Sequence, residues 1–340
     1  MRRILPLLVL VAVAAACGDD AGEPETLRLM AHNSFAGSVS EETFAPFTEA
    51  TGISVEMIAA GDAGSMVNQA ALSKDNPLAD LLFGVDDTFL SRALDEEIFA
   101  PYQSRLLDSV EPGLIPDTDL VTPIDYGDVC LNYDKAFFAD TPVTELDQLR
   151  EPDVARALTV EHPATSSPGL AFLLATIDEY GEEGWGEFWS DLREGGVNVA
   201  PDWDTAYYND FTRYGGDSSL VVSYASSPPA EVIFATEPLD EAPTGVIEAG
   251  CYRQVEYAGV LAGTEYPEAA AELIDYMLSV RFQETIPLTW FVFPVNTDAE
   301  LPTEFVDHTI VPDDPARLDP ATIAENRDRW IDEWVAVMEG

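Results

Sequence analysis

The chain alternates between strand-like and helix-like stretches, and this alternation restricts its fold more than any other feature. In the first third, short apolar runs alternate with amphipathic stretches. The expected strands are 27–31, 54–59 and 81–85, and the expected helices are 41–49, 66–73 and 89–97. Strands that alternate with helices build βαβ units around a mainly parallel sheet. The sequence therefore predicts an α/β fold.

A second series of the same kind begins near residue 128. Its expected strands are 129–133, 158–161, 220–223 and 256–261, and its expected helices are 170–180, 185–192, one opening at Pro228, 267–279, 281–286 and 320–338. Asp319 is the expected N-cap of the last helix and Pro320 its first residue. With 340 residues, the chain is long enough for two α/β domains. These domains could follow one another or be interleaved, with 122–133 and 251–261 crossing between them, and periodicity does not decide.

The composition is strongly acidic. Lys and Arg total 16 against 63 Asp and Glu, for a formal net charge of -47. Like charges would repel nucleic acid and anionic membrane surfaces, so we expect no nucleic-acid partner. Two interpretations stay open: a heavily hydrated surface, or a field that attracts a cationic ligand.

The N-terminus has the pattern of an export signal. Arg2 and Arg3 precede an apolar run at 4–15, and small residues lead to Cys17. The run is too short to span a bilayer as a helix, which needs about 20 residues. We predict a signal peptide at 1–16 and a polar tether at 17–26, with Cys17 as the site of lipidation. The alternative is an ordinary signal peptide followed by a chance cysteine.

Two further cysteines, Cys130 and Cys251, each lie in an expected strand. An even pair in an exported protein can form a disulfide if the two strands are neighbours. Two unpaired buried thiols are the alternative, and the sequence alone leaves the choice open.

Sequence signatures of catalysis and of metal binding are missing. The histidines His32, His162 and His308 show no metal-type spacing, and no phosphate-binding or nucleophile-elbow motif occurs. His162 near Ser166 and Ser167 is the obvious candidate for a hydrolase site, since such sites are set by geometry. We favour a polar loop that leads into a helix, and we expect no enzyme activity, cofactor or metal.

Similar short polar stretches follow the expected strands at places where a helix is about to begin. They are HNSFAGS from His32, GDAGS from Gly61, TSSPGL from Thr165 and SYASSPP from Ser223. Ligands of α/β folds bind beyond the carboxyl ends of strands, where free helix N–H groups point. Each stretch alone would be a plain helix cap, whereas together they predict a binding site.

Aromatic residues lie close to these stretches and could stack on a planar or cationic ligand. Trp203, Tyr207, Tyr224 and Trp290 are the candidates. Asp202 and Asp204 flank Trp203, which argues against a core position for this residue. Core packing is the expected role of the helical tryptophans, Trp185, Trp189, Trp330 and Trp334.

At these residues the sequence resembles the thiamine-binding lipoprotein or periplasmic family of ABC importers. The resemblance extends in order over the mature chain, through MAHNSF, LADLLFGVDDTFLSRAL, TPIDYGDVCLNYDK, HPATSSPGLAFLL, PDWDTAY, LVVSYASSPPAE, IPLTWFVFPV and ENRDRWIDEWVAVM. It implies a type II periplasmic binding protein fold with interleaved domains and a ligand in the cleft between them. Domain 1 would comprise 27–125 plus 258–340, and domain 2 would comprise 126–257. Cys130 and Cys251 would then lie in the hinge strands, which favours their pairing.

Position by position, the resemblance implies a set of thiamine contacts: Asp62, Ala63, Ser166, Ser167, Trp203, Tyr224, Ala225, Ser226 and Ser227. The same motifs and aromatic stretches add further candidates: His32, Asn33, Asp86, Tyr207 and Trp290. The aromatic rings would stack on the ligand, Asp62 would face its positive charge or its amine, and the serines would hold its hydroxyl or a phosphate. The implied partners are thiamine or its phosphates and an ABC permease. The protein itself would be an exported monomer, either periplasmic or attached to the membrane by its lipid anchor alone.

The chain departs from this family's usual pattern at Asn33, where an Asp is usual, at Asp87, where an Asn is usual, and at Ala63, where a Gly can stand. The first change removes a carboxylate near the cleft and the second adds one. The preference among thiamine and its phosphates is therefore left open, because a more acidic cleft disfavours phosphates.

Other ligands fit part of the pattern. Adjacent Tyr207 and Tyr208 are similar to the paired tyrosines of ferric-ion-binding proteins of the same fold, although hard cations need more oxygen ligands than these. An acidic aromatic cleft would also suit a polyamine, and a sugar receptor or an extracellular hydrolase are the remaining alternatives.

Overall fold

The computed structural model describes residues 24–138 and 143–340. The predicted signal peptide, the lipidation site Cys17 and most of the tether lie outside these residues. Within them, no helix is both long and apolar enough to cross a membrane.

The described strands form one nine-stranded sheet in the order β2-β1-β3-β8-β4-β7-β5-β6, with β9 paired to β4. Their bounds are β1 (Thr26–Ala31), β2 (Ser54–Ala59), β3 (Leu81–Asp86), β4 (Thr122–Asp134), β5 (Leu158–Glu161), β6 (Asn198–Ala200), β7 (Leu220–Tyr224), β8 (Thr244–Val260) and β9 (Phe293–Pro294). The prediction of an α/β fold is confirmed.

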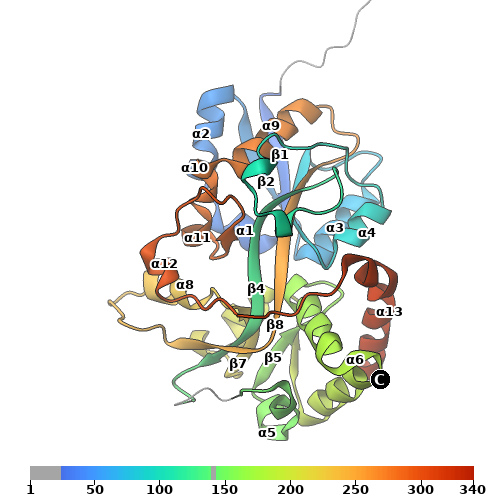
Figure 1. The fold of residues 1–340 in the computed structure, drawn as a ribbon, viewed down its shortest axis with the longest axis vertical. Coiled ribbons are helices and arrows are strands. Elements are labelled where there is room, and N and C mark those ends of the chain that lie inside the picture. Colours follow the sequence, from blue (N-terminus) through green and yellow to red (C-terminus); the bar gives the residue numbers. More distant parts are fainter. Residues whose placement is uncertain (1–23, 139–142) are drawn as a thin grey trace, which may run out of the picture.

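Parallel pairing is confined to the two outer parts of the sheet. Strand β1 pairs in parallel with β2 and β3, and β5 pairs in parallel with β6 and β7. The centre is antiparallel, because β4 and β8 cross the molecule in opposite directions and pair along most of their length. Figure 1 shows these two long strands joining an upper and a lower lobe.

Helices cover both faces of the sheet. Their bounds are α1 (Asn33–Ser38), α2 (Glu41–Thr51), α3 (Ala63–Leu72), α4 (Leu90–Asp95), α5 (Pro152–Ala155), α6 (Ser167–Gly195), α7 (Trp203–Thr205), α8 (Pro228–Ile233), α9 (Pro267–Leu278), α10 (Val280–Gln283), α11 (Ile286–Thr289), α12 (Thr303–Val306) and α13 (Pro320–Glu339). Single turns of other helix types are η1 (Leu107–Ser109), η2 (Pro112–Leu114), η3 (Leu146–Arg150), η4 (Ala206–Asp210) and η5 (Thr212–Tyr214).

The predicted helices at 170–180 and 185–192 are the two parts of α6. Gly181 separates them with a φ of 66° and a ψ of 175°, a conformation that glycine adopts without a side-chain clash. Asp319 is the N-cap of α13 and Pro320 its first residue, as predicted.

The helical tryptophans pack in the core, as the sequence predicts. Trp189 of α6 and Trp334 of α13 are 1% exposed, and their rings meet edge to face with centroids 5.4 Å apart. Trp185 and Trp330 are buried beside them. This contact fixes the C-terminal helix against the lower lobe (Figure 1).

The first lobe, uppermost in Figure 1, contains β1–β3 with α1–α4 and α9–α11, and the second contains β5–β7 with α5–α8. After β9 the chain returns along the second lobe, where α12 packs against α8 and α13 packs mainly against α6. The division into domain 1 at 27–125 plus 258–340 and domain 2 at 126–257 stays a prediction.

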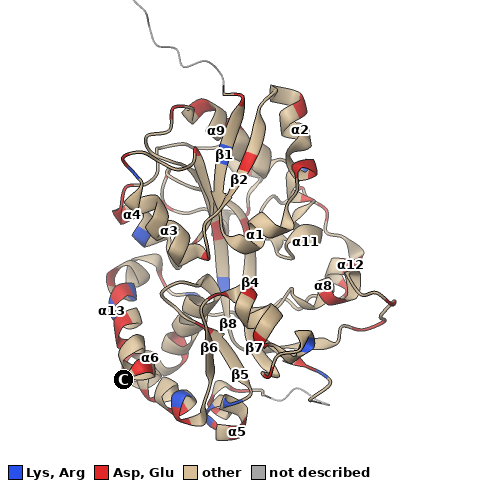
Figure 2. Ribbon diagram, turned by 180° about the vertical axis from the view of Figure 1, so that it is seen from behind, with Lys and Arg blue, Asp and Glu red and all other residues tan. Residues whose placement is uncertain are grey.

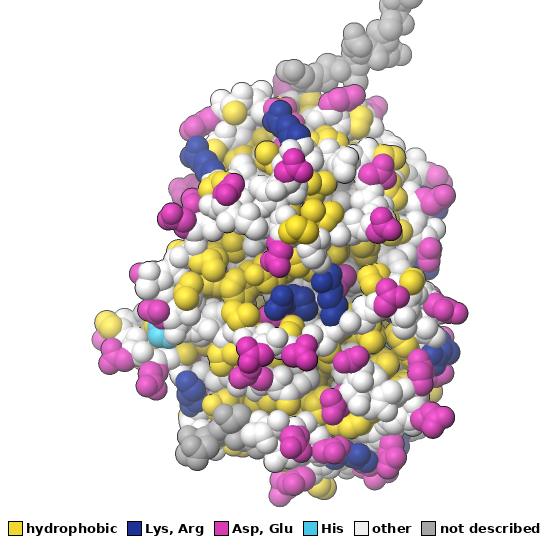
Figure 3. Space-filling model, viewed as in Figure 1, with side chains coloured by type: hydrophobic (Ala, Val, Ile, Leu, Met, Phe, Trp, Pro, Cys, Tyr) yellow, Lys and Arg dark blue, Asp and Glu magenta, His cyan; other side chains and the backbone are white. Residues whose placement is uncertain are grey.

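Acidic side chains are distributed over both lobes. Figure 2 shows them on the helices of each lobe, and Figure 3 shows them scattered across the visible face with few basic groups among them. This distribution fits the interpretation of a hydrated acidic surface. A local field at a binding site has to come from particular residues.

Two cross-links tie β4 to β8. Cys130 and Cys251 are joined by a disulfide, with their Cα atoms 4.3 Å apart. Nearby, Arg253 of β8 donates to both carboxylate oxygens of Asp128 on β4, with Nη2 lying 3.0 Å from Oδ2. Because Asp128 is buried, the guanidinium supplies the partner that its carboxylate needs.

We expect the double substitution Cys130→Ser and Cys251→Ser to lower the free energy of unfolding by about 2–5 kcal/mol. The bond closes a loop of 121 residues, so its loss frees the unfolded chain. Urea unfolding followed by circular dichroism would measure the change. Wild-type protein treated with a reductant should show a similar loss, and equal midpoints in all three samples would contradict this role.

Candidate binding site

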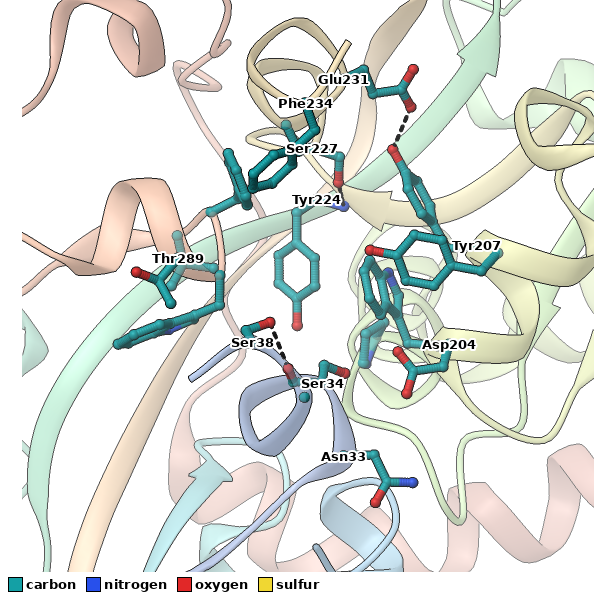
Figure 4. Close-up of a pocket in the computed structure, with 18 of the residues that line it drawn as sticks. Asn33, Ser34, Ser38, Asp204, Tyr207, Tyr224, Ser227, Glu231, Phe234 and Thr289 are labelled. Atoms are coloured by element: carbon teal, nitrogen blue, oxygen red, sulfur yellow. Dashed lines mark hydrogen bonds between the residues drawn. The ribbon is translucent and has the colours of Figure 1, made fainter. Parts of the chain in front are cut away.

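The polar stretches predicted from the sequence converge on one cavity. His32, Asp62, Ser166 and Ser227 are the N-caps of α1, α3, α6 and α8, and these helices begin just after β1, β2, β5 and β7. The cavity has a volume of about 760 Å³ and is lined by residues from both lobes. Figure 4 shows the ring of Tyr224 projecting into it, between residues of α1 and residues of the second lobe.

Asp62 joins the two lobes at the edge of this cavity. Its Oδ1 accepts a hydrogen bond from its neighbour Ala63 N at 2.9 Å, which caps α3. Its Oδ2 faces the second lobe, where the backbone N–H of Trp203 lies 3.4 Å away. The carboxylate therefore contacts the backbone of Trp203, the residue whose ring the sequence predicts as a stacking surface, and both residues line the cavity.

An aromatic group of the second lobe forms one wall. Trp203 stacks on Tyr207 with centroids 5.1 Å apart and an interplanar angle of 13°. The rings of Tyr224 and Trp203 have centroids 6.4 Å apart and an interplanar angle of 66°. Such a wall offers apolar faces to a planar ligand.

Trp290 contributes to the opposite wall from the first lobe. Its ring packs edge to face on the buried Phe35 at 4.9 Å, and its Nε1 donates to Asp125 Oδ2 at 3.0 Å. The next residue, Phe291, has a φ of 60°, which is uncommon for a residue other than glycine. Phe291 contacts Phe234 of the second lobe at 5.5 Å, so aromatic side chains meet across the cleft.

The charges at the cavity wall are mostly negative. Two of its acids have a basic neighbour: Glu256 lies 3.3 Å from Nε2 of His32, and Glu231 is paired with Arg213. Burial raises the pKa of Asp62, although His32 opposes the rise. Burial raises the pKa of Asp204 as well, with added repulsion from Asp202 and Asp62. Among the described residues, neither Asp62 nor Asp204 forms an ion pair, so in their charged forms these two acids are the ones most available to attract a cation.

A row of buried acids lies across three neighbouring strands behind this wall. Asp86 of β3 pairs with Glu256 of β8, which pairs in turn with Asp125 of β4. Burial raises the pKa of Asp125 and Asp86, helped by repulsion from Glu256 and Asp87, respectively. The ion pair with His32 opposes the burial of Glu256 and lowers its pKa. The charged form is therefore favoured at Glu256 and disfavoured at Asp86 and Asp125.

Several buried hydroxyls at helix starts lack a hydrogen-bond partner among the described residues. Ser166 and Ser167 lie at the N-terminus of α6 and Ser226 precedes α8. Of these, Ser167 lines the cavity. A buried hydroxyl needs a partner, so this position suits a polar ligand atom.

Most of the predicted contact residues line the cavity. They are His32, Asn33, Asp62, Ser167, Trp203, Tyr207, Tyr224, Ser227 and Trp290. The others are buried next to it rather than in its lining: Ala63, Asp86, Ser166, Ala225 and Ser226. The role of each residue in binding stays a prediction.

Several residues of the lining were not predicted from the sequence: Ser34, Ser38, Asp204, Arg213, Tyr214, Glu231, Phe234, Glu256, Thr289 and Phe291. Asp204 could have been predicted, because it adjoins Trp203 in the sequence. No sequence pattern marks Glu256 as a site residue, since its position depends on the pairing of β8 with β3 and β4.

The departures at Asn33 and Asp87 have different surroundings. Asn33 lines the cavity, and its Oδ1 accepts from Gly61 N at 3.0 Å. Asp87 is 7% exposed and accepts from Val255 N, outside the cavity lining. The extra carboxylate at Asp87 therefore does not face the ligand space.

The alternative sites have their polar atoms engaged elsewhere. His162 Nδ1 accepts from Ala164 N, and its Nε2 lies 3.9 Å from Glu339, so neither nitrogen faces Ser166 or Ser167. Tyr207 donates its hydroxyl to Glu231 Oε1 at 2.8 Å. In residues 24–138 and 143–340, no group of three or more His, Cys, Asp and Glu side chains could hold a metal ion.

Comparisons with known proteins identify relatives that cover most of the chain. Residues 76–310 match the family described as bacterial extracellular solute-binding protein. The thiamine-binding periplasmic protein of Brucella suis is 30% identical over 319 residues, 92% of each chain. That of Escherichia coli is 30% identical over 339 residues, 98% of each chain. A solved structure of a periplasmic thiamin binding protein is similar, with a TM-score of 0.81, 28% identity and coverage of 92% of this chain and 96% of that one. The chain belongs to the family of bacterial extracellular solute-binding proteins.

Proposed function

We propose that the protein captures thiamine in the cavity between its lobes and delivers it to an ABC importer, without catalysing a reaction. The observation that carries this proposal is that Asp62 and Asp204 line the same cavity as the aromatic side chain of Trp203. Relatives that cover nearly the whole chain are described as thiamine-binding, which supports the same ligand.

The chemistry of thiamine matches the two kinds of surface in the cavity. Its planar aminopyrimidine and thiazolium rings can stack on Trp203, Tyr224 and Trp290. The permanent positive charge of the thiazolium suits aromatic faces and the carboxylates Asp62 and Asp204. Ser167 and Ser227 offer hydroxyls for the polar end of the ligand.

The lining charges favour thiamine over its phosphates. Asp62, Asp204, Glu231 and Glu256 line the cavity, whereas Arg213 is the lining guanidinium and is already paired with Glu231. A phosphate would add negative charge next to these carboxylates, which is unfavourable at short range. The N–H groups at the start of α6, beside Ser166 and Ser167, are the part of the site that would oppose this preference.

Delivery requires export and a partner. We infer that residues 1–16 direct export and that Cys17 carries the lipid that holds the protein at the outer face of the cell membrane. The protein would act there as a monomer, with an ABC permease as its partner and no membrane contact besides the anchor. The pattern of Arg2, Arg3 and the apolar run supports this inference.

A ferric ion or a polyamine would be the alternative ligand. The hydrogen bond of Tyr207 to Glu231 disfavours iron, because that hydroxyl would have to leave its partner and lose its proton. Burial next to Glu231 raises the pKa of Tyr207 well above its usual value, which makes the proton harder to remove. A polyamine has no ring for the aromatic wall.

Trp203→Ala should weaken thiamine binding by at least about tenfold, because the substitution removes the stacking face. Calorimetric titration with thiamine, thiamine monophosphate, thiamine diphosphate and spermidine would measure affinity and ligand class together. Phe137→Ala, at a 62% exposed aromatic residue outside the cavity, is the matched control. Unchanged affinity in Trp203→Ala would remove this residue from the site. Tighter binding of spermidine than of thiamine in the wild type would refute the proposed ligand.

Thiamine affinity should fall as the pH is lowered from about 8 to about 5. The raised pKa values of Asp62 and Asp204 make these acids take up protons early as the pH falls, so attraction for the cation is lost. Burial alone would lower the pKa of His32, but Glu256 raises it overall, so His32 gains a repelling charge over the same range. In Asp62→Asn the affinity at the higher pH should be lower and the pH dependence weaker. Titrations across this range would show it, and binding that strengthens in acid would contradict the assignment.

Cys17→Ser should release the protein from membranes, because it removes the predicted acylation site. Detergent phase partitioning of the expressed protein would measure this change. Wild-type protein should enter the detergent phase and the variant the aqueous phase. A variant that still partitions into detergent would contradict the lipid anchor.

A further inference from the structure

The ring of Trp203 is held in place by contacts with side chains from other elements. Its Nε1 donates to Ser223 Oγ at 3.0 Å, and its face stacks on Tyr207. The ring of Tyr208 packs edge to face with that of Trp203, with centroids 5.5 Å apart and an interplanar angle of 81°. The partners come from β7 and from the turn η4, so the position of the ring depends on tertiary contacts.

Ser223 is placed to act as a fixed acceptor. It lies in β7, opposite Cys130 of β4 in the ladder, and is 0% exposed. Indole N–H groups only donate, so the Ser223 oxygen receives this bond and its own proton needs an acceptor. Ser227 Oγ lies 2.9 Å away, and either hydroxyl can donate to the other. Ser223 is thereby held between the indole of Trp203 and the hydroxyl of Ser227.

The same chain of hydrogen bonds reaches the backbone of Tyr224. Ser227 Oγ also accepts from the backbone N–H of Tyr224 at 3.3 Å. Ser227 itself lines the cavity. Ser223 therefore connects the indole of Trp203 to the start of α8 through Ser227.

Tyr207 supports the ring from behind. Its hydroxyl donates to Glu231 Oε1 at 2.8 Å, and the other oxygen of Glu231 accepts from Arg213 Nε. Figure 4 shows the Tyr207 hydroxyl directed at Glu231 rather than at the centre of the cavity. With Tyr207 covering one face of Trp203, the opposite face is the one left for a ligand.

We propose that Ser223 is a positioning residue that fixes the indole of Trp203 through its Nε1–H, with Tyr207 as the backing ring, so that a single face is presented to a planar cation. This inference rests on the proposed function for the identity of the ligand. It deepens that function by assigning the geometry of the stacking surface to a side chain outside the cavity lining. Tyr207 accordingly acts through Trp203, whose ring it supports by stacking.

A double-mutant cycle tests the proposal. Ser223→Ala should weaken thiamine binding by about three- to tenfold, the effect of losing one hydrogen bond to a buried group. In a Trp203→Phe background, which keeps a stacking ring but lacks the N–H, Ser223→Ala should cause a much smaller further loss. Equal losses in both backgrounds would overturn the proposal, because the serine would then act independently of the indole.

A readout without ligand separates this inference from the proposed function. Near-ultraviolet circular dichroism of the ligand-free protein should change on Ser223→Ala when residue 203 is Trp, and should not change in the Trp203→Phe background. If wild-type protein fails to bind thiamine, the proposed function fails, and this spectral comparison still decides the positioning role. A spectrum that does not respond to Ser223→Ala in either background would overturn that role.

The matched control is Ser219→Ala. Ser219 is a buried serine immediately before β7, 6% exposed and away from the cavity lining. It should leave both affinity and spectrum unchanged. Urea unfolding of each variant would show that the compared proteins are folded under the conditions of the titration.

Discussion

The antiparallel pairing of β4 with β8 is the constraint on which the rest of the structure depends. These two strands are the part of the sheet that belongs to both lobes, so their register fixes which residues meet at the cleft. It places Asp125 opposite Glu256, and through Asp125 it fixes the anchor of Trp290. The disulfide between Cys130 and Cys251 and the pairing of Asp128 with Arg253 reinforce the same ladder. A shift of one residue would turn each of these side chains to the opposite face.

The sequence predicts the parts of the site that depend on local chemistry. A polar, small-residue stretch after a strand is typical of a helix start, so the loops at His32, Asp62, Ser166 and Ser227 could be identified directly. Trp203 could be predicted as a site residue because acidic residues flank it. Ser223 opens one of the predicted stretches, but its contact with Trp203 and the position of Glu256 could not be predicted, since each depends on a partner distant in sequence.

The fold was predictable to a similar extent. The alternation of strands and helices along the sequence predicts the α/β class and the parallel outer strands. The antiparallel centre depends on the direction in which the chain crosses between lobes, which hydrophobic periodicity does not encode. The position of α13 depends on the path of residues 295–319, a largely irregular segment that carries no periodic signal. In both the fold and the site, the features that could not be predicted are contacts between residues distant in the sequence.

The negative groups of the cleft are divided between the two lobes, and this division links ligand charge to closure. Asp62 belongs to the first lobe, whereas Asp204 belongs to the second, and their carboxylates repel each other. A cation placed between them would replace that repulsion with two attractions, which are strong at short range in a partly desolvated site. The lobes already meet beside this point, where Gly64 N donates to Thr165 O at 3.0 Å and Trp203 N faces Asp62. A ligand that carries both a ring and a positive charge would therefore stabilise the closed arrangement more than a neutral ring or a ringless cation, because only differential contacts shift such an equilibrium.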